Sequence, residues 1–309
     1  MTITATVIED SVGVDAPRLT TFQLRYPRFI HAELMTHRVF SRNASSSRAI
    51  PVKKLIADIV RDTAMPMYWG SNKPGMQAGE EINDKVCVAE GEWIADTGVW
   101  DSTPIYKTRE AAWMHARDNA IKMAEAFDAA GYHKQIVNRL LEPFSHINTL
   151  VTSTDWANWN GLRDHPDAQP EIRVLAKAMI EAKSNSAPAL RIHEVSKTSA
   201  WHLPYMSTEE REKETVLTLA RASAARCARV SYLTHDMKPP NIKDDLKLYG
   251  QLMEGVIKHA SPTEHQAKAD LFGKLVNDKI PLYTQAYYHG NFRGWIQFRK
   301  TIIGENIND

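Results

Sequence analysis

Three arginines, four serines and a histidine share one segment of twelve residues near the N-terminus of the chain. The segment runs from His37 to Arg48 and reads HRVFSRNASSSR. Serine hydroxyls, loop N–H groups and a guanidinium can together bind a phosphate or a nucleotide, because they supply several donors around one anion. A solvated loop has the same composition, and polar loops are common on protein surfaces. On this segment alone, the surface loop is the simpler interpretation.

A second segment places an asparagine and an arginine shortly before the expected start of a helix. Asn158 and Arg163 are five positions apart, and Pro170 and Glu171 open the helix that follows. Such a pair could bind the edge of a flat heterocycle. The alternative is an ordinary turn followed by a surface helix with an Arg–Glu pair. A third segment, ARVSY, covers residues 228–232.

A fourth segment, HASPTEH, carries two imidazoles and a carboxylate between His259 and His265. The spacing of the two histidines is poor for zinc, and no cysteine accompanies them. In isolation, a capped helix terminus is the simpler interpretation of this segment. We therefore expect no metal site.

Several common catalytic motifs are missing from the sequence. The chain has no G-x-G-x-x-G, no Walker A motif and no G-x-S-x-G, so the usual dinucleotide, P-loop and hydrolase sites are not indicated. Neither Cys87 nor Cys227 has a neighbouring histidine in the sequence that could activate it. A thiolate nucleophile is therefore not expected.

The composition is that of a globular protein without a charge surplus. Among 309 residues, Lys and Arg number 38 and Asp and Glu 37, which gives a net charge of +1. This balance excludes a bulk nucleic-acid binder. Two cysteines are too few for a disulfide framework, and the N-terminus lacks the pattern of a signal peptide, so we expect a cytoplasmic protein. No run of 18 apolar residues predicts a membrane span.

The elements that must position these segments follow from local patterns. Alternating and β-branched residues predict strands over 1–9 and 19–26. A helix over 28–37 and a loop over 38–48 follow. Further helices are predicted over 107–130, 133–151, 170–183, from about 208 towards 227, and over 244–259. We expect one domain over 1–309, with an insertion or lid at 51–105 and a C-terminal extension at 269–309.

Taken together, the four segments resemble the motifs of the flavin-dependent thymidylate synthases. That family has an Arg-His-Arg signature followed by Asn, Ser and Arg, a helix with an Arg before Leu-Pro, and an Asn, Leu-Arg, Ala-Gln-x-Glu-Ile signature. The matching residues here are Thr36-His37-Arg38, Asn43, Ser46 and Arg48, then Arg139 within 134–141, and then Asn158, Leu162-Arg163 and residues 168–172.

The order of the motifs differs from that of the family. Ala-Arg-Val-Ser and His-x-Ser/Thr-Pro-Phe-Glu-His stand near the family's N-terminus, whereas their counterparts here lie at 228–231 and 259–265. The chain therefore resembles a circular permutation of the family fold, which a protein tolerates when its original termini lie close together at the surface.

The resemblance implies an α/β (α+β) subunit with helices packed on a small mixed or antiparallel sheet, in permuted order. It implies a homotetramer whose active sites are shared between subunits. The implied reaction makes dTMP from dUMP with methylenetetrahydrofolate and NADPH as co-substrates and FAD as cofactor. The implied partners are a pyrimidine deoxynucleotide monophosphate and folate, with neither nucleic acid nor membrane.

The resemblance also assigns roles to individual residues. Arg163 and Ser46 would be catalytic. The substrate would be bound by Glu33, Ser46, Ser47, Arg48, Arg139 and Arg163. The flavin would be bound by His37, Arg38, Asn43, Asn158, Ser231, His259, Ser261 and Glu264.

Some positions depart from the family pattern and keep alternatives open. Thr36 replaces the first Arg, Glu33 a Gln and Ala44 an acidic residue; Thr152 and Thr154 replace an Asn and an Arg, and Thr263 replaces a Phe. One alternative is a flavin-dependent methylase or hydroxymethylase of another pyrimidine nucleotide, dCMP or dUMP. The other is a nucleotide-binding homologue without flavin.

Overall fold

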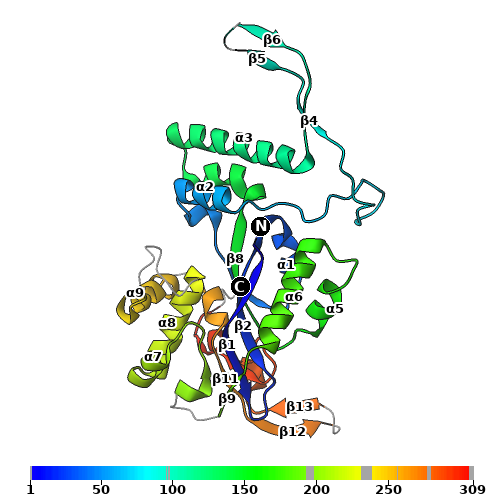
Figure 1. Ribbon diagram of the computed structural model, residues 1–309. Coiled ribbons are helices and arrows are strands. Elements are labelled where there is room, and N and C mark those ends of the chain that lie inside the picture. The colour runs from blue at the N-terminus through cyan, green and yellow to red at the C-terminus, as the bar shows by residue number, and fades with distance from the viewer. Residues whose placement is uncertain are drawn as a thin grey trace.

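The computed structural model describes residues 2–94, 96, 98–192, 198–230, 239–255, 257–276 and 280–305. A five-stranded sheet lies at its centre (Figure 1). Its strands, in their order across the sheet, are β3 (Ser41–Ala44), β8 (His146–Ser153), β2 (Leu19–Pro27), β1 (Thr4–Gly13) and β9 (Ala189–Arg191). The first four strands pair antiparallel, and β9 runs parallel to β1.

Strand β2 divides its side chains between the two faces of the sheet, because successive residues point to opposite sides. Phe22, Leu24 and Tyr26 are buried in the main hydrophobic core. Helices α5 (Ala157–Arg163) and α6 (Pro170–Ser184) contribute Trp159, Ile172 and further side chains to the same core. The short helix α1 (His31–Met35) contributes Leu34.

Segments from the second half of the chain cover the other face. Tyr205 and Cys227 pack against Leu150 of β8. The covering elements are α7 (Thr208–Lys213), α8 (Val216–Arg229), α9 (Ile242–Met253) and a small sheet of β10 (Trp201–His202), β11 (Ala267–Ala269) and β14 (Trp295–Gln297). A hairpin of β12 (Phe272–Val276) and β13 (Ile280–Tyr283) follows β11.

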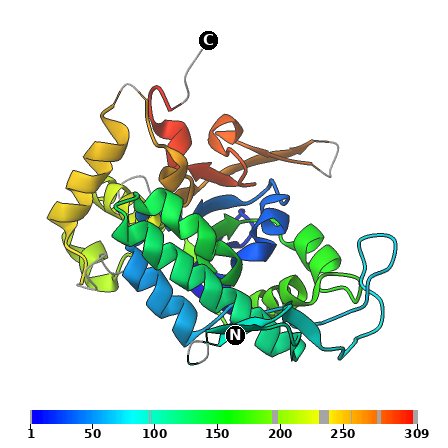
Figure 2. The ribbon, with the colours of Figure 1, turned by 90° about the horizontal axis from the view of Figure 1, so that it is seen from above.

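A second core lies beside the sheet. Helices α2 (Val52–Arg61), α3 (Arg109–Ala129) and α4 (Lys134–Val137) pack there with the 3-10 helix η3 (Asn138–Phe144), and Figure 2 shows α2 alongside α3. An arm extends away from this core in Figure 1. It contains the strand pairs β4 (Val86–Ala89) with β7 (Ile105–Lys107) and β5 (Glu92–Ile94) with β6 (Val99–Asp101).

The predicted α/β class, with helices packed on a small mixed sheet, is confirmed. The strands β1 and β2 and the helices α3 and α6 lie where the sequence predicted them, within a few residues. Helix α9 begins close to its predicted start but ends at Met253 rather than at 259. The insertion or lid at 51–105 and the extension at 269–309 stay predictions. In the structure, α2 is part of the second core, and the rest of 51–105 includes the arm.

Three predicted elements were wrong. The helix over 133–151 ends near Pro143 and is followed by β8, whose β-branched residues suit a strand that pairs on both sides. The loop over 38–48 contains β3, which pairs with β8. The helix from 208 towards 227 is two helices, because the backbone is extended at Glu214 and Thr215 caps the second one.

Candidate functional site

His37 lies just after α1 and is held in an aromatic surround. Its ring stacks on Phe40, with centroids 5.7 Å apart, and meets Trp159 edge-on at 4.8 Å. The Nε of Arg163 donates to His37 Nε2 at 2.9 Å. Burial, together with the charges of Arg163 and Arg42, lowers the pKa of His37 to about 4. His37 is therefore neutral near pH 7, with its proton on Nδ1 and its Nε2 lone pair turned to Arg163.

In the folded chain Arg163 lies against the segment that begins at His37, although the two residues are 126 positions apart in the sequence. Its Nη2 donates to Thr36 Oγ1 at 3.3 Å, and its Nη1 lies 3.8 Å from Glu33 Oε2. Burial raises the pKa of Glu33, an effect that the charge of Arg163 opposes. The guanidinium is thus fixed by one neutral imidazole and one hydroxyl, with a single carboxylate at longer range.

The predicted phosphate-binding residues converge on Glu142, which the sequence did not single out. The Oγ of Ser47 donates to Glu142 Oε1 at 2.6 Å, and Arg139 Nη1 donates to both carboxylate oxygens at 2.9 and 3.1 Å. Ser46 caps the 3-10 helix η2 (Ser47–Ala49), where its Oγ accepts from the backbone N–H of Arg48 at 3.3 Å. A bound anion would share Arg139 and Ser47 with Glu142.

Arg28 is a second residue at this end that sequence reasoning missed. Its Nη2 donates to Ser45 O at 3.4 Å, and its Nε lies 3.8 Å from Glu142 Oε1 without a hydrogen-bond partner among the described residues. Burial lowers the pKa of Arg28, an effect that the charge of Glu142 opposes. A half-buried guanidinium beside the serine-rich loop suits an anion site, and a bound anion would share it with Glu142. The only sequence signal was its place directly after Pro27, at the end of β2.

The segment 259–265 lies against β3. The side-chain amide of Asn43 lies 3.5 Å from Ser261 Oγ and 3.0 Å from His265 Nε2. Glu264 forms an ion pair with Arg299, and its backbone oxygen accepts from Gln297 Nε2 at 3.0 Å. The segment 259–265 therefore packs against the His37–Arg48 loop through Ser261 and His265. The circular permutation itself stays a prediction.

The C-terminal region contributes contacts that no motif indicated. Asn291 Nδ2 donates to Val39 O at 2.9 Å and to Ser41 Oγ at 3.0 Å. Gln297 Nε2 donates to Asn291 Oδ1 at 2.8 Å. These amides fix the loop before β3, but single Asn and Gln residues far along the chain give no recognisable sequence signal.

Four predicted site residues are exposed and free. Within the described part of the chain, their side chains form no hydrogen bond or ion pair; they are Arg38, Arg48, Asn158 and His259. Ser231 lies outside the described residues. The structure therefore joins His37, Arg163 and Glu33 in one group, Ser47 and Arg139 in a second, and Asn43 and Ser261 in a third.

No group of three or more His, Cys, Asp or Glu side chains is placed to hold a metal ion in the described ranges. No described helix is long and apolar enough to cross a membrane.

Comparisons with known proteins identify the family. The sequence profile of the thymidylate synthase complementing proteins (Thy1) matches residues 19–189. Two solved structures of the UMP/dUMP methylase PolB from Streptomyces cacaoi are similar. The one with 5-Br UMP has 18% identity and a TM-score of 0.42, and covers 59% of this chain and 89% of that chain. The one with 5-Br dUMP has 16% identity and a TM-score of 0.42, and covers 59% and 90%.

No curated protein matches the chain. The family profile, however, spans more than half of the 309 residues, and it includes β2, β3, β8 and the groups around His37 and Glu142. On this match, the chain belongs to the thymidylate synthase complementing protein family.

Proposed function

We propose that the chain is a flavin-dependent enzyme that methylates dUMP to dTMP. Methylenetetrahydrofolate would supply the carbon and NADPH the reducing equivalents. The observation that carries the proposal is the hydrogen bond of 2.9 Å from Arg163 to the neutral His37. This bond joins the motif at His37 to the motif at Arg163, which are far apart in the sequence. Both motifs lie within the family match and would serve one active site.

The nucleotide would be bound at both ends. Arg48 is free to pair with the phosphate, and Ser46, Ser47 and Arg139 lie on the same loop and the neighbouring 3-10 helix. A guanidinium and several hydroxyls match the oxygens of a phosphate dianion. Glu33 and Arg163 would face the base.

Arg163 would act on the reacting ring. Methylation at C5 requires C5 to become nucleophilic, and negative charge then develops on the pyrimidine. A guanidinium that is already oriented stabilises that charge without reorganising during the reaction. His37 contributes by accepting from Arg163 without adding a positive charge beside it. Glu33 lies at longer range from the guanidinium.

The residues present fit a flavin. An FAD has a diphosphate and a flat ring with polar edges, which require cationic donors and amide or hydroxyl partners. The exposed Arg38, Asn158 and His259 have no partners in the described chain. The remaining residues proposed for flavin binding are His37, Asn43, Ser231, Ser261 and Glu264. When bound, the flavin would supply the redox chemistry.

A cysteine nucleophile is not part of the proposal. Cys227 is fully buried, and burial raises the pKa of its thiol, so the thiol stays protonated near pH 7. Cys87 is exposed on β4 in the arm. The carbon transfer would therefore depend on positioning and electrostatics rather than on a covalent bond to the enzyme.

Glu33 favours a second candidate, a flavin-dependent methylase or hydroxymethylase of dCMP. Its carboxyl lies beside Arg163 at the proposed base end. A carboxylate can accept a hydrogen bond from the exocyclic amine of cytosine, whereas uracil has an oxygen at that position.

Tritium release from 5-labelled nucleotides tests the proposal. With FAD, NADPH and methylenetetrahydrofolate present, we expect release from dUMP and formation of dTMP. Release from dCMP alone would support the second candidate. A purified protein that binds dUMP but neither binds FAD nor releases tritium would instead be a nucleotide-binding homologue without flavin, and the proposal would fail.

A further inference from the structure

A row of buried polar side chains crosses the sheet face opposite α6 and ends at Asn43. The row consists of Ser11, His202, Thr21, Thr152, His265 and Asn43. Its successive contacts are Ser11 Oγ to His202 Nδ1 (2.9 Å), His202 Nε2 to Thr21 Oγ1 (2.7 Å), Thr21 Oγ1 to Thr152 Oγ1 (2.6 Å), Thr152 Oγ1 to His265 Nδ1 (2.7 Å) and His265 Nε2 to the Asn43 amide (3.0 Å). The proposed chemistry makes no use of its interior members.

Every member except Asn43 is inaccessible to solvent. Ser11, Thr21, Thr152, His202 and His265 each have an exposure of 0%. Burial lowers the pKa of His265 to about 3 and that of His202 well below its usual range. Both rings are therefore neutral near pH 7, and a neutral imidazole has one N–H donor and one acceptor nitrogen.

The surroundings of Asn43 set the direction of the hydrogen bonds. One end of its amide faces three atoms at once: His265 Nε2 at 3.0 Å, and the backbone oxygens of Arg42 and Ser261 at 3.2 Å each. Backbone oxygens can only accept, so the amide nitrogen belongs at this end. His265 Nε2 then accepts, and its Nδ1–H donates to Thr152.

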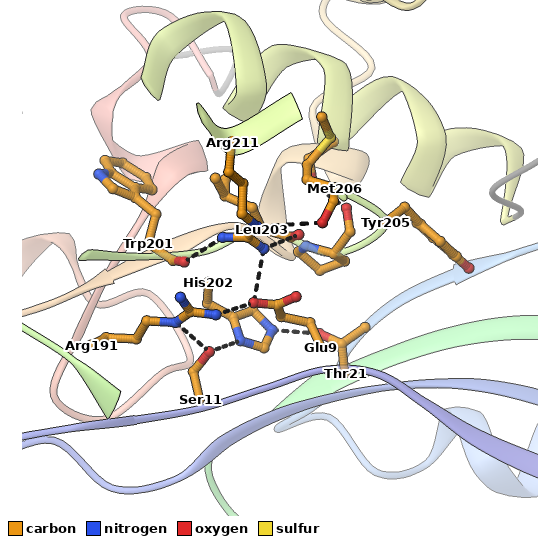
Figure 3. A network of polar contacts seen from close by, with 12 residues as sticks. Glu9, Ser11, Thr21, Arg191, Trp201, His202, Leu203, Tyr205, Met206 and Arg211 are labelled. Atoms are coloured by element: carbon orange, nitrogen blue, oxygen red, sulfur yellow. Dashed lines mark hydrogen bonds and ion pairs between the residues drawn. The ribbon is translucent and has the colours of Figure 1, made fainter. Parts of the chain in front are cut away.

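The direction continues to the far end of the row. Thr152 donates to Thr21, Thr21 donates to His202 Nε2, and His202 Nδ1–H donates to Ser11. Figure 3 shows this end, where Arg191 Nε also donates to Ser11 Oγ at 3.0 Å. Arg191 is itself paired with Glu9, at 2.5 Å between Nη2 and Oε1. The row is therefore anchored on a fixed ion pair.

We infer that Thr152 and His265 are positioning residues that act together with the backbone oxygens of Arg42 and Ser261. They hold the Asn43 amide with its Nδ2 inward and its Oδ1 on the side of Ser261 Oγ, in the proposed flavin and nucleotide site. The inference rests on the proposed function, because the ligand is what Oδ1 would contact. An acceptor at this point suits the N–H edge of a flavin or pyrimidine ring. Reversal of the row would turn the amide nitrogen outward and offer a donor instead.

Thr152→Val tests the row, because it removes one hydroxyl with little change in shape. Thr149→Val is the matched control. Thr149 lies on the same strand, has an exposure of 0%, and bonds Tyr26 on the opposite face at 2.8 Å. Thr152→Ser keeps the hydroxyl and should behave as the wild type.

The first readout needs no ligand. In the NMR spectrum of protein labelled with ¹⁵N-histidine, wild-type His265 should be the Nδ1–H tautomer. Thr152→Val removes the acceptor of that proton, so the Nδ1–H resonance should shift, whereas Thr149→Val and Thr152→Ser should leave it in place. An Nε2–H tautomer in the wild type, or no change in Thr152→Val, would overturn the inference.

The second readout is the affinity for FAD and for dUMP. Loss of one positioning hydrogen bond should weaken binding of the ligand that contacts Asn43 by about three- to tenfold. In an Asn43→Ala background, Thr152→Val should cause no further loss, because the residue that it positions is already gone. An equal loss in both backgrounds would show a general structural effect and would contradict the inference. If the wild type binds neither FAD nor dUMP, the proposed function fails, and the histidine spectra alone decide the row.

Discussion

Arg163 is the side chain on which the proposed chemistry depends most. It is oriented by His37 and Thr36 and lies near one carboxylate, Glu33. We expect Arg163→Ala to lower kcat for dUMP by about two orders of magnitude or more, with a smaller effect on dUMP affinity, because its charge matters most when the ring becomes anionic.

Arg163→Lys is the companion variant. A lysine cannot reproduce the planar fork that bonds His37 and Thr36 together, so it should restore little activity. Steady-state kinetics and dUMP titration would separate the two effects. Equal losses in kcat/KM and in affinity, with kcat unchanged, would show that Arg163 only binds the substrate.

His37 gives a pH prediction. Its folded-state pKa of about 4 lies below the usual 6.5, so between these values the unfolded chain binds a proton that the folded protein does not. The free energy of unfolding should therefore fall as the pH decreases from 6.5 towards 4. His146 and His265, with pKa values lowered to about 4 and about 3, contribute in the same direction.

His37→Gln isolates the contribution of His37, because glutamine keeps an acceptor for Arg163 but does not titrate. Urea unfolding at several pH values should give a shallower decrease for this variant than for the wild type. An identical decrease in both proteins would mean that His37 is protonated in the folded state as readily as in the unfolded chain.

At this scale the sequence predicted the right residue types but not all their partners. The proximity of Asn43 to Ser261 followed from the motif match, and the structure joins them across 218 positions. Glu142 could not be predicted as the partner of Ser47 and Arg139, because a carboxylate in a predicted helix has no distinguishing mark. The row from Ser11 to Asn43 was equally hidden, since its members are common residues on separate elements.

At the scale of elements, the helix starts were predictable where side chains cap them. Ser207 and Glu210 form the expected capping box, and Pro170 opens α6. Strand β8 had local signals in Pro143 and in its β-branched residues, but the apolar spacing that predicted a helix over 133–151 outweighed them. The segment forms a strand because it pairs with β2 on one side and β3 on the other, and β2 and β3 lie far away in the sequence.

Glu210 gives the strongest prediction for an element, since it serves two helices. It accepts from the backbone N–H of Ser207 at 2.9 Å and also pairs with the fully buried Arg226 at 2.5 Å. Ser207→Ala should lower the free energy of unfolding by about 1 kcal/mol. Glu210→Ala should cost about 3 kcal/mol or more, because it leaves a buried guanidinium with less compensation.

Denaturant unfolding measures both variants. Glu209→Ala is the control and should leave stability nearly unchanged. Glu209 lies on the same helix, is exposed, and among the described residues pairs with Lys213 alone. A Glu210→Ala variant as stable as Ser207→Ala would show that the Glu210–Arg226 pair adds nothing to the cap.

For the whole molecule, the arm bears on the expected homotetramer. Trp93 and Trp100 are paired across its end strands, with exposures of 62% and 56%, and Tyr106 is 58% exposed. Large aromatic side chains left exposed on an extended arm suit contacts between subunits. We expect four chains per particle, and a smaller particle when both tryptophans are replaced by serine.

Light scattering at working concentrations decides this prediction, with far-UV circular dichroism to show that the variant is folded. A wild type with one chain per particle would contradict the shared-site assembly. A tetramer that persists in the double variant would show that the arm is not the contact, although the assembly itself would stand.

The central claim is that the groups around His37, Glu142 and Asn43 form one site for flavin and nucleotide. The most direct measurement is the visible absorbance of the protein titrated first with FAD and then with dUMP. We expect FAD to bind and its spectrum to change when dUMP is added, because the two rings would occupy one site. The change should be much smaller in Arg163→Ala. Binding of FAD with no response to saturating dUMP, or no binding of FAD at all, would contradict the account.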